Sequence, residues 1–209
     1  MNNITYHKWD IRDFKKLKKS CSEILKLSDI QFFQPYFSLY FHIHNTKNSH
    51  QLIDLNRRFI VKEIIESNII KYYSSNKFIN SVIYDKKKNH VFTKELFCKC
   101  IPILNPIHFM MNNYNNIVSR NNLLPSCYHS NTYQKINNID NNAYIDTLFS
   151  YICSNITEND INPSFSIFYG SINGIKKKFN YDISEEYYEL NHEDCFIKNL
   201  GKLYELNFY

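Results

Sequence analysis

Glycine is scarce in this 209-residue chain, with only three residues, and none of them precedes Gly170. A glycine-rich loop that cradles phosphates is therefore excluded before that residue, because such loops need glycine for close backbone approach. Proline is also rare, with five residues, whereas asparagine outnumbers lysine and arginine together. This composition is typical of an AT-rich genome, so it indicates the source of the gene more directly than a function.

Long apolar runs and closely spaced cysteines are also lacking. No uninterrupted apolar run approaches the ~18 residues that a membrane span needs. No secretory signal opens the chain, and the cysteines lack the dense spacing of a disulfide scaffold. We therefore predict a soluble, intracellular protein with reduced thiols and no membrane partner. The six cysteines are Cys21, Cys98, Cys100, Cys127, Cys153 and Cys195.

The chain does have the material for a hydrophobic core. Its hydrophobic fraction is 44%, and it contains 17 tyrosines and 16 phenylalanines. At this length one sizeable core is the default, so we predict a single α+β domain over residues 1–209. The net charge of +5 is mildly basic and falls short of the concentrated basic stripe of most nucleic-acid binders.

The amino-terminal half predicts two helices and a strand before a hairpin. Residues 1–30 and 51–73 carry apolar positions at helical spacing, and residues 32–43 alternate as a strand does. Residues 78–84 and 91–103 predict a β-hairpin around a polar loop. The expected apolar face of the first helix consists of Phe14, Leu17, Cys21, Ile24, Leu25 and Ile30, and that of the second consists of Leu52, Leu55, Phe59, Ile60, Ile64, Ile65 and Ile69.

The carboxy-terminal half begins with a polar, asparagine-rich segment, residues 112–142, which predicts a loop or an insertion. A helix follows, with Asn141 or Asn142 as its cap. Residues 164–170 predict a buried strand, and residues 196–209 predict a hairpin whose apolar end suggests a truncated chain. The helix is expected to pack through Ile145, Leu148, Phe149, Ile152, Cys153 and Ile156.

The sequence contains two pairs of residues of types that bind metals. His42 and His44 lie two apart on a predicted strand, and Cys98 and Cys100 form a second pair of the same spacing. A mixed site of two cysteines and two histidines is conceivable. Neither pair has the loop spacing of structural zinc sites, so we predict no metal site.

Lys99 lies inside the apolar run of residues 91–106, which predicts a strand that ends at a proline. Two interpretations of this lysine remain open. It either has an anionic partner, or it extends from a strand edge and uses its methylene groups as apolar cover.

Several segments resemble a known family in their order and rough spacing. They are Phe97-Cys-Lys-Cys-Ile-Pro-Ile-Leu-Asn-Pro106, Leu124-Pro125, the segment from Asn141 to Ser154, Phe165-Ser-Ile-Phe-Tyr-Gly-Ser171 and Asn199-Leu-Gly-Lys-Leu-Tyr204. Together they resemble the uncharacterised kinase-like proteins encoded by large nucleocytoplasmic DNA viruses of the mimivirus type. The resemblance covers about residues 97–204 and implies the amino-terminal part of such a protein.

The resemblance implies an antiparallel sheet packed with several helices, like a kinase small lobe with an amino-terminal helical extension. Residues 165–170 would be a central strand of that lobe. Lys99 would contact the phosphates of a nucleotide, and Asp146 would be the helix carboxylate that orients it. ATP is then the expected ligand; without the resemblance no cofactor is predicted. The implied location is the host cytoplasm or the virion.

The departures from a kinase exclude a complete phosphotransferase. The chain has no glycine-rich loop before Lys99, no His-Arg-Asp loop and no Asp-Phe-Gly motif. A kinase needs the catalytic aspartate and the residues that hold Mg²⁺. We therefore predict a non-catalytic, pseudokinase-like viral protein with a binding or scaffolding role. Its expected partner is another protein or a missing carboxy-terminal lobe.

The alternative is a structural or nucleic-acid-associated virion protein. It is suggested by the positive net charge, the many aromatic residues and two runs of three lysines, Lys86-Lys-Lys88 and Lys176-Lys-Lys178. A platform for single strands needs aromatics and cations together on one exposed face. Most aromatics here instead fall on predicted core faces.

Overall fold

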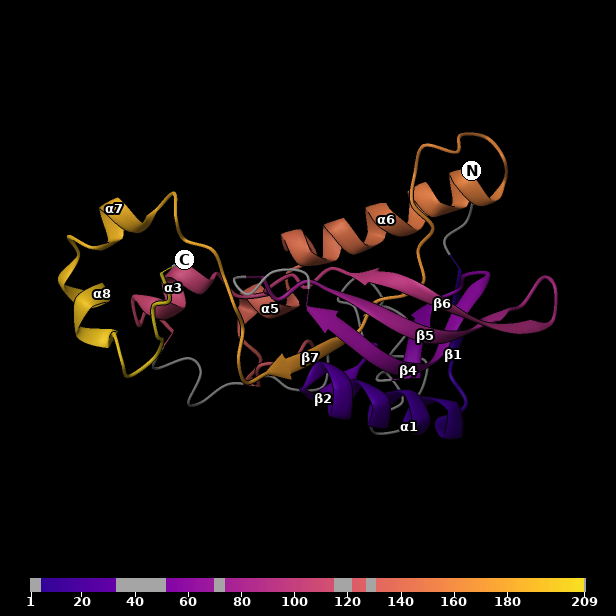
Figure 1. Cartoon of the computed structure of the whole chain (residues 1–209), viewed down its shortest axis with the longest axis horizontal. Helices are drawn as coiled ribbons and strands as arrows, with labels where there is room; N and C mark the ends of the chain where they lie inside the picture. The colour runs from indigo at the N-terminus through magenta and orange to yellow at the C-terminus, as the bar shows by residue number, and fades with distance from the viewer. Residues whose placement is uncertain (1–4, 33–51, 70–73, 115–121, 127–130, 209) are drawn as a thin grey trace.

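The computed structural model describes residues 5–32, 52–69, 74–114, 122–126 and 131–208. It is an α+β structure in which antiparallel sheets pack with several helices, so this part of the fold prediction is confirmed. Figure 1 shows the sheets, α1 and α6 in one half of the molecule and the short helices α3, α7 and α8 in the other. The prediction of a single domain stays a prediction.

The largest sheet contains β4 (Phe59–Ile69), β5 (Lys77–Asp85) and β6 (His90–Cys98), antiparallel and in that order. The predicted hairpin is confirmed, since β5 and β6 pair along their whole length around a turn at residues 86–89. The second strand is shorter than expected, because it ends at Cys98. Lys99 therefore follows the strand instead of lying inside it.

The helix predicted over residues 51–73 is wrong, because the described part of this segment mainly forms β3 (Ile53–Leu55) and β4. Val61, Ile64 and Ser67 pair with the buried positions of β5, and β-bulges interrupt the register on both sides of Ile64. Each bulge adds one residue to β4. The residues that face the β5 core positions are therefore three apart instead of two, which is the spacing that resembled a helix.

The amino-terminal segment forms two small antiparallel sheets around a helix. β1 (Tyr6–Lys8) pairs with β3 (Ile53–Leu55), and β2 (Leu27–Gln31) pairs with β7 (Asn173–Lys176). Between β1 and β2 lies α1 (Ile11–Ser20). These pairings bring β7 from the distant carboxy-terminal half beside the start of the chain.

The prediction of a helix in residues 1–30 is confirmed, but the helix is shorter than predicted. Asp10 caps α1, with its carboxylate accepting a hydrogen bond from the Arg12 amide, and the helix continues into a π-helical turn, Cys21–Leu25. Lys26 has a positive φ and ends the helix. Ile30 was expected on the helix and instead lies in β2.

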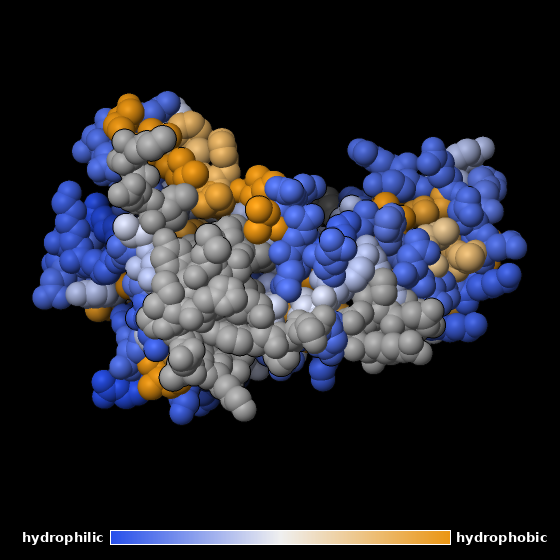
Figure 2. All heavy atoms as spheres, turned by 180° about the vertical axis from the view of Figure 1, so that it is seen from behind, coloured by the Kyte–Doolittle hydropathy of each residue, from blue (hydrophilic) through white to orange (hydrophobic). Residues whose placement is uncertain are grey.

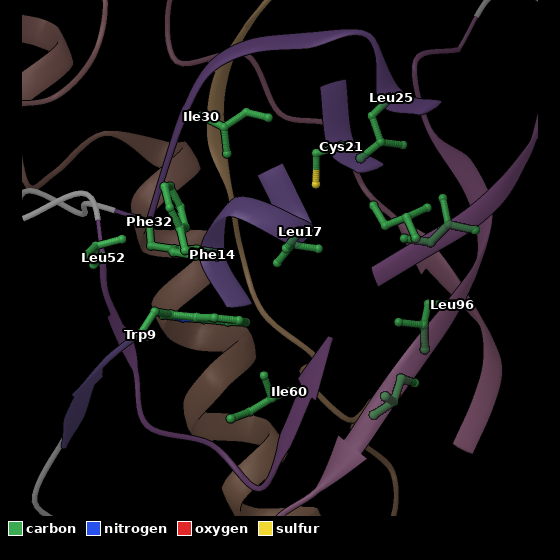
Figure 3. Close-up of a cluster of buried hydrophobic side chains, with 13 residues drawn as sticks. Trp9, Phe14, Leu17, Cys21, Leu25, Ile30, Phe32, Leu52, Ile60 and Leu96 are labelled. Atoms are coloured by element: carbon green, nitrogen blue, oxygen red, sulfur yellow. The ribbon is translucent and has the colours of Figure 1, made fainter. Parts of the chain in front are cut away.

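The main hydrophobic core lies between α1 and one face of the sheet β4–β6. Phe14, Leu17 and Cys21 of the helical segment pack there with Ile60 and Leu96 of the sheet (Figure 3). At one end of this core the rings of Trp9 and Phe32 stack with centroids 4.8 Å apart. The core positions predicted on α1 are therefore confirmed.

Helix α6 (Asn142–Glu158) has the predicted cap, since the Asn141 side chain accepts a hydrogen bond from the Ala143 amide. Its predicted core face is wrong in part: Cys153 is buried as expected, whereas Ile145, Phe149 and Ile152 are exposed. The helix instead buries the side that carries Tyr144, Tyr151, Cys153 and Ser154. Hydrophobic residues therefore reach the surface of the half of the molecule that holds the sheets (Figure 2).

Tyrosine hydroxyl groups explain how α6 is rotated. The Tyr144 hydroxyl donates to the Ile136 carbonyl at 2.7 Å, and the Tyr151 hydroxyl donates to the Asn56 carbonyl at 2.9 Å. A buried tyrosine contributes a large apolar ring and is stable when its hydroxyl finds such an acceptor. Sequence hydropathy alone ranked these two tyrosines below the aliphatic residues.

The remaining helices are short: α3 (Pro106–Met110), α5 (Gln134–Asn137), α7 (Tyr187–Leu190) and α8 (Asp194–Asn199). Met110, Leu190 and Phe196 form a second hydrophobic cluster at the end of the molecule opposite the β5–β6 turn (Figure 1). The predicted carboxy-terminal hairpin is wrong, because it begins inside α8. The strand predicted for residues 164–170 is also wrong, since these residues are irregular and mostly exposed.

Other predictions are settled only in part. Residues 112–142, predicted as a loop or insertion, contain α5, and parts of them lie outside the described residues. The predicted strand from Phe32 to Ile43 lies almost wholly outside them, as do His42 and His44. No helix in the described part of the chain is both long and apolar enough to cross a membrane.

Candidate ligand-binding cleft

A cleft of about 2010 Å³ lies between the two halves of the molecule. Its walls include the end of β6 with the residues that follow it (94–104), one side of α6, the irregular segment with β7 (165–184) and residues 201–208. Pockets for small molecules usually measure about 300–1,000 Å³, so this space is large for a single compact ligand.

Lys99 and Asp146, the two site residues chosen from the sequence, meet on the wall of this cleft. Lys99 Nζ lies 2.7 Å from Asp146 Oδ1. Lys99 directly follows the end of β6, and Asp146 lies in the second turn of α6. The lysine therefore has an anionic partner, the first of its two interpretations. The side chains are 54% and 38% exposed, so the pair contributes only about 0–1 kcal/mol to stability.

The cleft carries an excess of positive charge. Seven lysines line it against four carboxylates, those of Glu95, Asp146, Asp182 and Glu205. Of these lysines Lys99 is the one found in a salt bridge among the described residues. Charges of one sign in a concave surface concentrate ligands of the opposite sign. The seven are Lys77, Lys94, Lys99, Lys176, Lys177, Lys178 and Lys202.

Two thiols lie among these lysines. Lys176 Nζ is 4.0 Å from Cys100 Sγ. Burial raises the pKa of the Cys98 thiol to about 11 and also raises that of Cys100, although Lys176 and Lys77 oppose the shift. A protonated thiol is a poor nucleophile and a poor metal ligand, so these cysteines line the cleft as small apolar groups.

The metal hypothesis gains no support from this arrangement. Across the described ranges, no three His, Cys, Asp or Glu side chains gather as a metal site would require. Cys98 and Cys100 are free thiols, and so are Cys21, Cys153 and Cys195.

The irregular wall of the cleft is held by a buried ion pair that the sequence analysis missed. Arg57 Nη1 lies 2.5 Å from Asp54 Oδ2, and both side chains are almost completely buried. Arg57 Nε also donates to the Tyr169 carbonyl at 2.8 Å, which ties residues 168–170 to the end of β3. The available signal was Asp54 itself, a charge inside the apolar run Leu-Ile-Asp-Leu.

Next to this pair, His7 on β1 faces Asp54 across the β1–β3 pairing. Burial lowers the pKa of His7 to about 4. The unfolded chain then takes up a proton near pH 6.5, whereas the folded protein resists it down to about pH 4. The free energy of unfolding should therefore fall as the pH falls through this range, by up to ~1.4 kcal/mol per pH unit.

Replacing His7 by glutamine should remove most of that slope. Urea unfolding at about pH 7, 6 and 5 measures it. His90, exposed at the start of β6, is the matched control, and His90→Gln should keep the slope. An unchanged slope in the His7→Gln variant would contradict this assignment.

Comparisons with protein-family models, with curated proteins and with solved structures found no match for this chain. The functional assignment therefore rests on the residues and geometry of the cleft.

Proposed function

We propose that this chain is a non-catalytic module that binds an anionic ligand, with a nucleotide as the first candidate, in the cleft. Lys99 contacts the phosphates, and Asp146 positions Lys99. The observation that carries the proposal is the 2.7 Å ion pair between these residues on the wall of a cleft rich in lysine. A long cation held by a helix carboxylate is preoriented for an anion, which lowers the entropy cost of binding.

The order of elements supports the kinase-like character of the module. β4, β5 and β6 form an antiparallel meander, Lys99 follows the third strand, and Asp146 lies on the long helix further along the chain. In the family that the sequence resembles, the strand lysine and the regulatory helix have this relation. No glycine occurs in the chain before Gly170, so the sequence offers no glycine-rich loop between the strands that precede Lys99, which agrees with binding without phosphotransfer.

The viral origin, the scaffolding role, the host cytoplasm or virion as location, and another protein or carboxy-terminal lobe as partner all derive from that resemblance. They stay predictions that belong to this proposal.

Thermal melting with Mg-ATP and with Mg-triphosphate tests the proposal. A ligand at a hundred times its dissociation constant stabilises the folded state by about 2.7 kcal/mol, and for a chain of this size the melting temperature should rise by roughly 5–10 °C. Lys99→Met should abolish the rise without unfolding the protein, because the pair is exposed. Asp146→Asn should reduce the rise, because Lys99 then loses the group that positions it.

The matched control is Lys87→Met, which removes a lysine from the exposed β5–β6 turn outside the cleft. This variant should keep the full rise. The proposal is wrong if neither ligand moves the melting temperature of the unmodified protein, or if Lys87→Met and Lys99→Met reduce the rise equally.

A further inference from the structure

Four aromatic side chains are exposed in the cleft, and two of them, Phe149 and Phe165, were expected in the core. Phe97 is 57% exposed, Phe149 63%, Phe165 38% and Tyr181 41%, and all four line the cleft. Phe149 lies three residues after Asp146, on the same side of α6. Phe97 lies near the end of β6, two residues before Lys99, and its ring lines the same cleft as the Lys99–Asp146 pair.

Cations and aromatic rings are also adjacent along the opposite wall. Three lysines, Lys176, Lys177 and Lys178, directly precede Phe179-Asn-Tyr181. The rings of Phe179 and Tyr181 stack with centroids 6.3 Å apart and an interplanar angle of 22°. The cleft thus has exposed rings and lysines on both walls, and such a combination on one exposed surface is what a nucleic-acid platform needs.

We propose that the anionic ligand of the cleft is a single strand of nucleic acid, whose phosphates contact the lysines and whose bases stack on Phe97 and Phe149. This inference rests on the proposed function and names its ligand class. Every base offers a flat π-face to such rings, and the phosphates carry the negative charge that the lysines of the cleft attract. An acidic peptide would satisfy the charges and leave the aromatic rings without a flat partner.

The size of the cleft and the placement of charge agree with a flexible strand. About 2010 Å³ is more than a mononucleotide fills, whereas several nucleotides could lie along it. The two lysine runs lie at opposite ends of the sheet region, one at the β5–β6 turn and the other at the end of β7 (Figure 1). They do not form the continuous basic surface that a rigid duplex needs.

Fluorescence anisotropy on the full chain tests the inference with three labelled ligands of equal charge. The first is oligo(dT) of about 15 nucleotides, the second is the same backbone without bases, and the third is polyphosphate. Oligo(dT) should bind at least about tenfold more tightly than the abasic strand, because stacking adds to the charge contribution. Its affinity should also fall steeply between about 50 mM and 200 mM salt.

Phe149→Ala and Phe97→Ala should each weaken oligo(dT) binding by about tenfold and leave the abasic strand unaffected. Both side chains are exposed, so the variants should stay folded. The matched control is Tyr188→Ala, since Tyr188 is exposed on α7 outside the cleft, and it should bind oligo(dT) as the unmodified protein does.

The binding results distinguish a failure of the nucleic-acid inference from a failure of the proposed anion binding. If oligo(dT), the abasic strand and polyphosphate bind equally, the inference is overturned and the anion-binding function stands. If an acidic peptide competes as well as oligo(dT), the ligand is a protein segment and the inference is also overturned. If no polyanion binds and Mg-ATP gives no thermal shift, both the inference and the proposed function fail.

Discussion

Replacing Asp54 by alanine is expected to lower the free energy of unfolding by about 3–5 kcal/mol. The substitution leaves the guanidinium of Arg57 buried without its counterion, since both side chains are almost completely buried. It also removes the acceptor of the Leu55 amide, which donates to Asp54 Oδ1 at 2.7 Å. Urea unfolding followed by circular dichroism measures the loss.

A double-mutant cycle separates the pair from its surroundings. Asp54→Ala, Arg57→Ala and the double variant should give a coupling energy of about 1.5–3 kcal/mol, because removing the second charge relieves the penalty left by the first. The pair of Lys16 and Glu63 is the matched control. It lies at the surface with Nζ and Oε2 2.9 Å apart, and its coupling should stay below about 1 kcal/mol.

Loss of the Asp54–Arg57 pair should also affect the wall of the cleft. Arg57 holds the Tyr169 carbonyl, so the Asp54→Ala variant should loosen residues 168–170 and increase their amide exchange before global unfolding. If Asp54→Ala costs less than about 1 kcal/mol, Arg57 is not held by a buried pair, and the anchor of this wall lies elsewhere.

Gly170→Ala is the second substitution with a large expected effect, a loss of about 2–4 kcal/mol. Gly170 has a φ of +134°, a conformation that L-residues with side chains rarely adopt. A Cβ atom there would lie 2.5 Å from Arg57 Nη2 and 2.8 Å from Arg57 Cζ. The guanidinium cannot move away easily, because Asp54 and the Tyr169 carbonyl hold it.

Gly201→Ala is the matched control for Gly170→Ala. Gly201 also has a positive φ, +74°, and a Cβ atom there would meet nothing within 4 Å. Only backbone strain then remains, so the expected loss is about 1 kcal/mol. Equal losses in the two variants would show that the contact with Arg57 contributes nothing. Thermal or urea unfolding of both variants, measured side by side, distinguishes these outcomes.

Local signals were sufficient for the elements whose stabilising contacts lie close in sequence. The cap and start of α6 follow from Asn141, and the hairpin of β5 and β6 follows from alternation around a polar turn. The pairing of Lys99 with Asp146 was also expected, through the resemblance of the surrounding motifs. The cap and the hairpin need only the residues themselves and their immediate neighbours, whereas Lys99 and Asp146 are 47 residues apart and were connected only through the resemblance.

Contacts between distant segments determined the rest, because local hydropathy contains no information about partners far along the chain. The two bulges of β4 are defined by its pairing with β5, which the sequence of β4 alone does not specify. The rotation of α6 about its axis is fixed by the hydrogen bond from the Tyr151 hydroxyl to the distant Asn56 carbonyl. The same rotation exposed Phe149. The sequence therefore supplied the lysine and its carboxylate, whereas tertiary packing placed aromatic rings beside them and formed the cleft.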